Sequence, residues 1–363
     1  MKQRIFLLVL IMSLVLTGCG TYVSVTPHRE QRQTGQTDAA SARNYLDLLS
    51  ALKTTIAAGT EVITITVADY PPEVLDRDVR QSILHAKNND PIGSYAVEDI
   101  AYEMGTRNGV PAVSLSIRYQ HNRTEIQRIR KAIDVERAEV IISDVLKGYE
   151  SSVVLLVENY ETRDFVQFVR DYAQEHPHNV MEVPLVSQSV YGTGKNRVVE
   201  LIFTYQTSRD SLRRMQSQVQ PVFDAARLYV SGDGEERQKF SQLYAFLMER
   251  FDYKLETSIT PSYSLLCYGV GDSRAFATVY AAMCNSAGLE CLVVTGTRGG
   301  EPRSWNIVRD AGQYYHVDLL HEQGNFLEFT DAQMDSYVWD YSEYPACNGE
   351  VAEEAVEITE EFP

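Results

Sequence analysis

The sequence predicts a mixed α/β (α+β) protein, with two repeated small α/β modules followed by a domain in which a central helix packs on an antiparallel sheet. One observation is an internal repeat: "SLSIRYQHNRTEIQRIRKAI" (114–133) aligns without a gap to "ELIFTYQTSRDSLRRMQSQV" (200–219). The other is the C-terminal order, in which a helix rich in small residues precedes the strand patterns "ECLVVTG", "RSWNIVRD" and "QYYHVDLL".

The N-terminal segment has the layout of a secretory signal. Lys2 and Arg4 precede the apolar run "IFLLVLIMSLVL", and "LTGC" places Cys19 at the cleavage position. This resembles a bacterial lipoprotein signal, which implies removal of 1–18 and attachment of lipid to the Cys19 sulfur. We therefore expect an exported protein, anchored to the lipid bilayer on the extracytoplasmic face. The alternative is an ordinary signal peptide or anchor with an incidental cysteine.

The chain is strongly acidic, and its two ends show no hydrophobic periodicity typical of a helix or a strand. The formal net charge is -17, which excludes nucleic acid as an expected partner. Residues 19–43 are polar and without helical or strand period, so we interpret them as a flexible tether. Residues 348–363 carry acids and no base, and we expect a disordered acidic tail there.

The first α/β repeat is expected at 44–133 and the second at 134–220. Each copy is interpreted as strand, helix, strand, hairpin turn, strand and helix, starting from "EVITITV" in the first copy and "SVVLLV" in the second. A spacer or interaction role is expected for both.

The repeats contain no catalytic motif and no motif for a metal or a cofactor. We therefore expect neither a catalytic site nor a bound metal or cofactor in them. Their histidines are scattered, without a metal-ligand spacing or a glycine-rich phosphate loop. His176 and His178 flank Pro177 at a predicted helix end, which favours a solvated turn over a metal site.

Residues 221–347 contain three short motifs: "YGVGDSRA" at the start of a predicted helix, and "PRSWN" and "YYHVD" in the two predicted strands that follow. These motifs and their order resemble those of the transglutaminase-like fold, a bacterial branch of the papain-like thiol enzymes, so a transglutaminase-like domain would lie at residues 221–347. In active members, the resemblance implies, a cysteine starts the central helix, a "HAWN"-type strand supplies a histidine, and a "WYHVD"-type strand supplies an aspartate. The three act as nucleophile, base and orienter.

Two of those three positions carry other residues in this chain. Carried over residue by residue, Gly271 stands at the cysteine position and Arg303 at the histidine position, whereas Asp318 is kept. Trp305 and Asn306 also match the family pattern. The domain is therefore expected to be catalytically silent, and the protein to act in binding or scaffolding at the cell surface.

A remodelled groove would use Asp272, Arg303, Trp305 and Asp318 to bind a peptide, a cell-wall fragment or a neighbouring envelope protein. The competing interpretation is that Arg303 pairs with Asp318 and preserves the sheet geometry. If the scaffold is intact, a cysteine at 271 with a histidine at 303 would regenerate a reactive thiol.

The alternative function class is a thiol or serine acyl hydrolase, or transglutaminase-like peptidase, with a relocated nucleophile. Cys267 or Ser273 would attack and His316 would serve as base, because His316 and Asp318 share one face of a strand. Asp272 opposes thiolate formation at Cys267.

The four cysteines beyond the signal allow several complete disulfide pairings in an exported domain. Cys267 with Cys347 is the preferred pair, because they lie before and after the predicted core. Cys284 and Cys291 are interpreted as small buried apolar residues.

Overall fold

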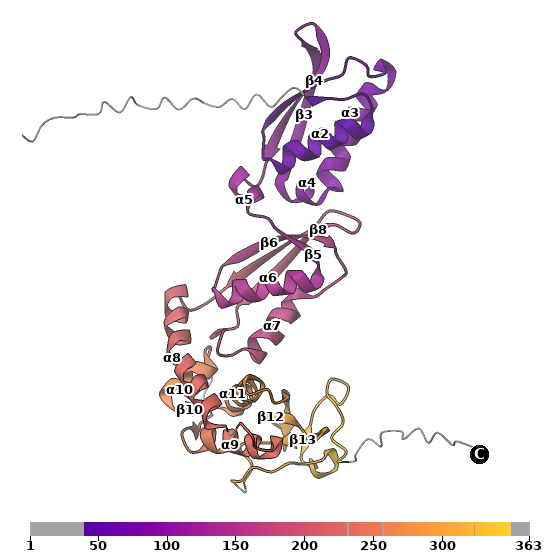
Figure 1. Ribbon diagram of the computed structural model, residues 1–363. Helices are drawn as coiled ribbons and strands as arrows, with labels where there is room; N and C mark the ends of the chain where they lie inside the picture. The colour runs from indigo at the N-terminus through magenta and orange to yellow at the C-terminus, as the bar shows by residue number, and fades with distance from the viewer. Residues whose placement is uncertain (1–39, 231, 256–257, 323, 350–363) are drawn as a thin grey trace, which may run out of the picture.

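The computed structural model describes residues 40–349 except 231, 256–257 and 323. The predicted signal, the lipidation site Cys19 and nearly all of the predicted tail lie outside them. Three units follow one another along an extended molecule (Figure 1). Within the described residues, no helix combines the length and the apolar character needed to cross a bilayer. The predicted mixed α/β fold class is confirmed.

The first module is one mixed sheet covered on one side by helices. Its elements are β1 (Ala40–Ser41), α2 (Tyr45–Ala57), β2 (Val62–Thr66), α3 (Pro72–Asn88), α4 (Pro91–Ala96), β3 (Val97–Arg107), β4 (Val110–Tyr119) and α5 (Arg123–Gln127). The strand order is β1-β2-β4-β3, with β1 parallel to β2 and the other pairs antiparallel.

The second module has the same topology. It contains β5 (Arg130–Asp134), α6 (Val135–Lys147), β6 (Ser152–Asn159), α7 (Phe165–Glu175), β7 (Leu185–Tyr191) and β8 (Arg197–Thr204). The order β5-β6-β8-β7 repeats the parallel and antiparallel pairings of the first sheet. This agreement supports the interpretation of the sequence match as a structural repeat.

Each module begins with a strand and a helix that the sequence interpretation did not include. In the second module these are β5 and α6, and β5 pairs with β6. The expected boundary between 133 and 134 is therefore wrong, since it cuts a paired strand. The short β5 carries little sequence pattern of its own, because only Ala132 is fully buried in it.

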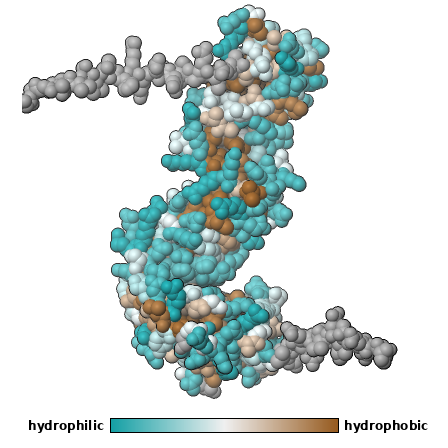
Figure 2. Space-filling model, viewed as in Figure 1, coloured by the Kyte–Doolittle hydropathy of each residue, from teal (hydrophilic) through white to brown (hydrophobic). Residues whose placement is uncertain are grey.

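The two modules meet through α4 and the β7–β8 hairpin. Tyr95 and Ala96 pack with Ile126 and Val198 in a small apolar cluster. Apolar surface lies at this junction in Figure 2. A Cβ on Gly192 of the hairpin would lie 2.7 Å from the backbone of Pro91, so glycine permits this close approach.

The C-terminal domain has a central helix on an antiparallel sheet, as predicted. Its elements are α9 (Glu236–Met248), β9 (Asp252–Tyr253), α10 (Pro261–Tyr268), β10 (Val270–Gly271), α11 (Ser273–Ser286), β11 (Cys291–Arg298), β12 (Glu301–Asp310), β13 (Gln313–Val317), η1 (Asp331–Gln333) and β14 (Tyr337–Val338). The order is β13-β12-β11-β14. The short strand β14 was not predicted.

One long helix, α8 (Arg209–Tyr229), links the second module to this domain. Its residues Leu212, Val219 and Phe223 share a core with α9 and α11. The expected boundary between 220 and 221 is therefore wrong, because it divides a helix that packs along its length into one core.

The composition of α11 follows from its position. Every residue from Ala275 to Cys284 is buried, and small side chains let neighbouring elements approach the helix on all sides. The sheet has two faces: Asn306 donates from β12 to the Ala277 carbonyl at 2.9 Å, whereas Trp305 and Ile307 pack on the opposite face.

Candidate functional site

The turn before α11 holds Gly271, where the resemblance predicts a cysteine in active members. Asp272 caps the helix, its carboxylate accepting the Ala275 N–H at 2.9 Å. Gly271 is buried, and a Cβ there would lie 2.9 Å from the Ala275 Cβ and 3.2 Å from Leu265. Position 271 therefore faces the packing of α10 against α11. The expectation that cysteine and histidine at 271 and 303 suffice to rebuild a reactive thiol does not fit this geometry.

Ser273, rather than residue 271, faces the neighbouring strand. It is the first residue of α11, and its Oγ accepts the backbone N–H of Ser304 on β12 at 3.2 Å. A hydroxyl at a helix start can serve as a nucleophile only with a base within reach. The neighbouring strand presents a backbone amide to it.

Arg303 and Asp318 form a buried bidentate ion pair, as the competing interpretation predicted. The Arg303 Nε lies 3.1 Å from Oδ2 of Asp318, and Nη2 lies 2.9 Å from Oδ1 and 2.7 Å from Oδ2. The side chains are 13% and 1% exposed. Such fork-to-carboxylate geometry is among the strongest charge-assisted contacts.

Three further groups complete this arrangement. Asp318 also accepts the Tyr337 hydroxyl at 2.6 Å and the Leu320 N–H at 3.0 Å, and Arg303 donates to the Leu320 carbonyl at 2.9 Å. The carboxylate that would orient a histidine is thus fully occupied. Sequence reasoning missed Tyr337, whose hydrogen bond to Asp318 depends on the return of the chain after β13.

His316 is buried on the face of the sheet opposite α11. Trp305 Nε1–H donates to its Nδ1 at 3.0 Å, which leaves the proton on Nε2, and Nε2 donates to Asp331 at 2.8 Å. Burial lowers the pKa of His316, although Asp331 opposes the shift. The imidazole is neutral with both nitrogens engaged, so it is not placed to act as a base for Ser273.

His316, Asp331 and Cys347 bring their potential ligand atoms within 4.8 Å of one another. A metal binds an imidazole nitrogen through a free lone pair. The hydrogen bond from Trp305 to Nδ1 fixes the ring proton on Nε2, so Nε2 has no free lone pair for a metal. Asp331 also accepts the Cys347 N–H at 3.0 Å, and burial raises the pKa of the Cys347 thiol to about 12. These contacts favour a hydrogen-bonded cluster that holds the C-terminal segment to the sheet.

The preferred disulfide between Cys267 and Cys347 is wrong, because the structure places the two cysteines on opposite sides of the sheet. Cys267 is exposed on α10, which packs on α8 and α11, whereas Cys347 is buried with Trp305 and Ile307 on the other face of the sheet. Cys267 lies in a short helix rather than the expected loop. Although the residue is exposed, partial desolvation by its neighbours raises the pKa of its thiol, so thiolate is disfavoured at neutral pH.

The four candidate groove residues do not share one cavity. Asp272 lines a pocket of about 270 Å³ at the start of α11, together with Gly271 and residues of α10. Arg303, Trp305 and Asp318 are absent from its lining, and Trp305 is 0% exposed.

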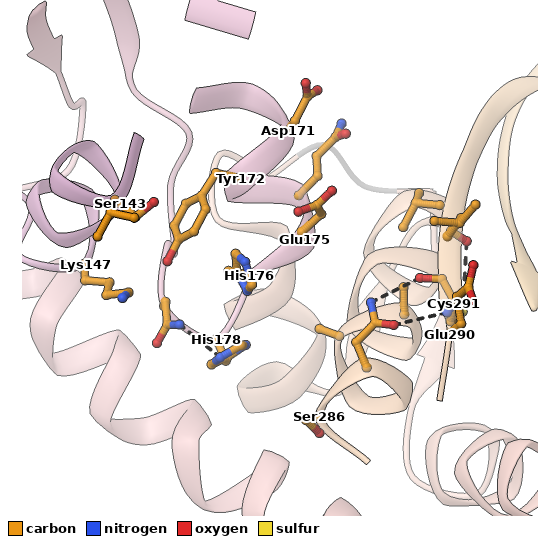
Figure 3. Close-up of a pocket in the computed structure, with 18 of the residues that line it drawn as sticks. Ser143, Lys147, Asp171, Tyr172, Glu175, His176, His178, Ser286, Glu290 and Cys291 are labelled. Carbon is orange, nitrogen blue, oxygen red and sulfur yellow. Dashed lines mark hydrogen bonds between the residues drawn. The ribbon is translucent and has the colours of Figure 1, made fainter. Parts of the chain in front are cut away.

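A cavity of about 1020 Å³ lies between the second module and the C-terminal domain (Figure 3). One wall comes from α6, α7 and the turn after α7, and the other from α11, β11 and the segment around Tyr344. His176 and His178 line it from the predicted turn at the end of α7, but their side chains are half-buried rather than fully solvated. The His176 ring lies 4.3 Å from that of Tyr172, and burial, followed by His176 and Lys147, lowers the pKa of His178 to about 4.

The rest of the cavity is rich in carboxylates. Asp171 and Glu175 of α7 lie on one wall, and Glu290 and Glu343 on the other. Burial, and then the charge of Asp171, raise the pKa of Glu175. The cavity thus combines aromatic rings with hydrogen-bond acceptors from two units. Neighbouring units supply its walls from distant parts of the sequence, so no local motif could have predicted it.

Three solved structures match this chain with low overall similarity. A solved structure described as a TGase matches at 10% identity and a TM-score of 0.27, covering 60% of this chain and 63% of that one. A candidate cysteine protease from Cytophaga hutchinsonii matches at 13% identity and a TM-score of 0.26, covering 40% and 65%. A candidate protease from Parabacteroides distasonis matches at 11% identity and a TM-score of 0.23, covering 74% and 44%.

The chain spans less than two thirds of each of these solved structures. No curated protein sequence matches it. Residues 224–319 match the family described as the Transglutaminase-like superfamily, and this segment contains α9, α11 and the strands β11, β12 and β13. The C-terminal part of the chain therefore contains a transglutaminase-like domain.

Proposed function

We propose that this protein is an exported lipoprotein whose transglutaminase-like domain is catalytically silent and acts in binding or scaffolding at the cell surface. The observation that carries the proposal is the buried pair of Arg303 and Asp318. An active thiol site of this type needs an imidazole where the guanidinium stands, and a free carboxylate face to orient it.

The residues that could form a relocated catalytic site also support the proposal that the domain has no catalytic activity. Ser273 faces a backbone amide, and His316 is engaged by Trp305 and Asp331 on the far face of the sheet. A nucleophile, a base and an orienter must converge within hydrogen-bond reach, and these residues do not.

The cavity between the second module and the C-terminal domain is our proposed place of binding. It is concave, is formed by two units and carries aromatic rings beside carboxylates, as ligand sites often do. The ligand classes remain a peptide, a cell-wall fragment or a neighbouring envelope protein. Binding across two units would also fix their relative orientation, which suits a scaffold.

The catalytic part is tested with the purified protein, amide and ester substrates, and a thiol-reactive probe at neutral pH. We expect no turnover and no fast labelling. Turnover that disappears in Cys267→Ala or Ser273→Ala would instead establish a hydrolase with a relocated nucleophile. Arg309→Ala serves as control, since Arg309 is an exposed residue of β12 outside these candidates.

The proposed membrane anchoring is tested by fractionating cells that express the Cys19→Ala variant. A lipid attached to Cys19 would supply most of the membrane affinity, so the variant should leave the membrane fraction or fail to mature. Cys267→Ala is the matched control and should fractionate like the parent. Unchanged membrane association of Cys19→Ala would contradict the lipoprotein proposal.

A further inference from the structure

Two cysteines that the sequence interpretation treated as core residues are held beside each other. Cys284 lies in the last turn of α11, and Cys291 is the first residue of β11. The Leu289 N–H donates to the Cys284 carbonyl at 3.0 Å. The Asn285 amide donates to the Cys291 carbonyl and accepts the Cys291 N–H, both at 3.1 Å. The backbones on the two sides of this turn are therefore closely tied.

The two side chains point into the same core. Both are free thiols in this structure, Cys284 is 0% and Cys291 2% exposed, and both belong to one core cluster. Burial, followed by the neighbouring Cys284 thiol, raises the pKa of Cys291, so the two thiols are neighbours. The other two cysteines have different surroundings: Cys267 is exposed, and Cys347 contacts the carbonyl of Pro345 on the far face of the sheet. Among the described cysteines, the structure thus brings one pair together.

We propose that Cys284 and Cys291 become a disulfide in the mature protein, an inference that rests on the proposed export. The two thiols lose two protons and two electrons as the S–S bond forms. A disulfide oxidant, either an exchange protein or glutathione disulfide, takes them up and is reduced to two thiols. The reaction takes place during folding, before the core closes around the sulfurs.

The bond would join α11 to β11 at the wall of the cavity. Asn285 lines that wall. Ser286 and Cys291 line it as well (Figure 3). A bridge across the turn restricts the unfolded chain and joins the two elements that form this wall. The proposal therefore adds a modification site to the proposed binding unit.

The first experiment examines protein taken from the envelope fraction, denatured with an alkylating reagent and digested with trypsin. Cleavage after Arg274 and Arg298 leaves both cysteines in one peptide, 275–298, and places Cys267 and Cys347 in other peptides. We expect 275–298 to be unlabelled and lighter by two hydrogens, and to accept two labels after reduction. Cys267 and Cys347 should be labelled without reduction.

The second experiment refolds the purified chain in a glutathione redox buffer, independently of export. The same peptide should become bridged, and reduction should lower the unfolding midpoint by about 5 °C. The double variant Cys284→Ala, Cys291→Ala should lose this response, whereas Cys267→Ala should keep it.

Full labelling of 275–298 in envelope protein would overturn the proposal. The refolding result then locates the fault: a bridge formed on refolding would contradict the proposed export, and continued labelling would contradict the pairing itself.

Discussion

The ion pair between Arg303 and Asp318 offers the sharpest test of what arginine does at position 303, where the resemblance predicts a histidine in active members. Arg303→Met keeps much of the side-chain length and removes the charge. It leaves the Asp318 carboxylate, with a side chain only 1% exposed, facing the Tyr337 hydroxyl and one backbone N–H. Removing one partner of a buried ion pair leaves the other charge buried without compensation, which destabilises the folded state.

The size of the effect follows from that burial. Breaking such a pair costs about 3–5 kcal/mol in unfolding free energy, because the desolvated charge loses its compensation. Arg309→Met on the same strand is the matched control. Its partner Glu290 is 3.4 Å away and the side chains are 51% and 44% exposed, so the loss should be about 0–1 kcal/mol.

Tryptophan fluorescence during denaturation measures both variants. The sequence contains two tryptophans, Trp305 and Trp339, and both lie in the core cluster beside the pair, so the signal reports on this domain. We expect Arg303→Met to lower the melting midpoint by about 10 °C. The double variant Arg303→Met, Asp318→Leu should recover most of the loss, since it removes both charges. A midpoint for Arg303→Met equal to that of Arg309→Met would refute the reasoning.

Two further predictions concern pH and the catalytic position. His178 has its pKa lowered to about 4 from an ordinary 6.5, so the unfolded chain takes up the proton first and stability falls as pH drops from 6.5 toward 4. The loss should be about 2 kcal/mol after solvent screening and should shrink in His178→Gln; an unchanged pH profile in that variant would assign the loss elsewhere. Gly271→Cys with Arg303→His should give a folded or destabilised protein without a fast-reacting thiol, because a side chain at 271 meets Ala275 and Leu265. Fast labelling of that thiol would show that α10 moves away from the helix start.

Part of the candidate site could be predicted from the sequence. The resemblance to the transglutaminase-like fold predicted that Gly271 and Arg303 stand at the cysteine and histidine positions, and the pairing of Arg303 with Asp318 followed from their opposite charges. The interdomain cavity could not be predicted, because α7 and α11 lie about a hundred residues apart and nothing local in either specifies the other. His178 illustrates this: its turn has a solvated sequence pattern, yet Phe223 of α8 lies 5.1 Å from its ring.

The sequence by itself determined the mixed α/β class, the repeat and the central helix on an antiparallel sheet. These depend on hydrophobic periodicity and turn residues, which act within a few positions along the chain. Tertiary structure alone decided which side chains meet: Cys267 and Cys347 separate onto two faces of a sheet, Cys284 and Cys291 come together, and His316 is held by Asp331. Such contacts depend on how packed layers place residues that are distant in sequence, and a linear pattern carries no record of that placement.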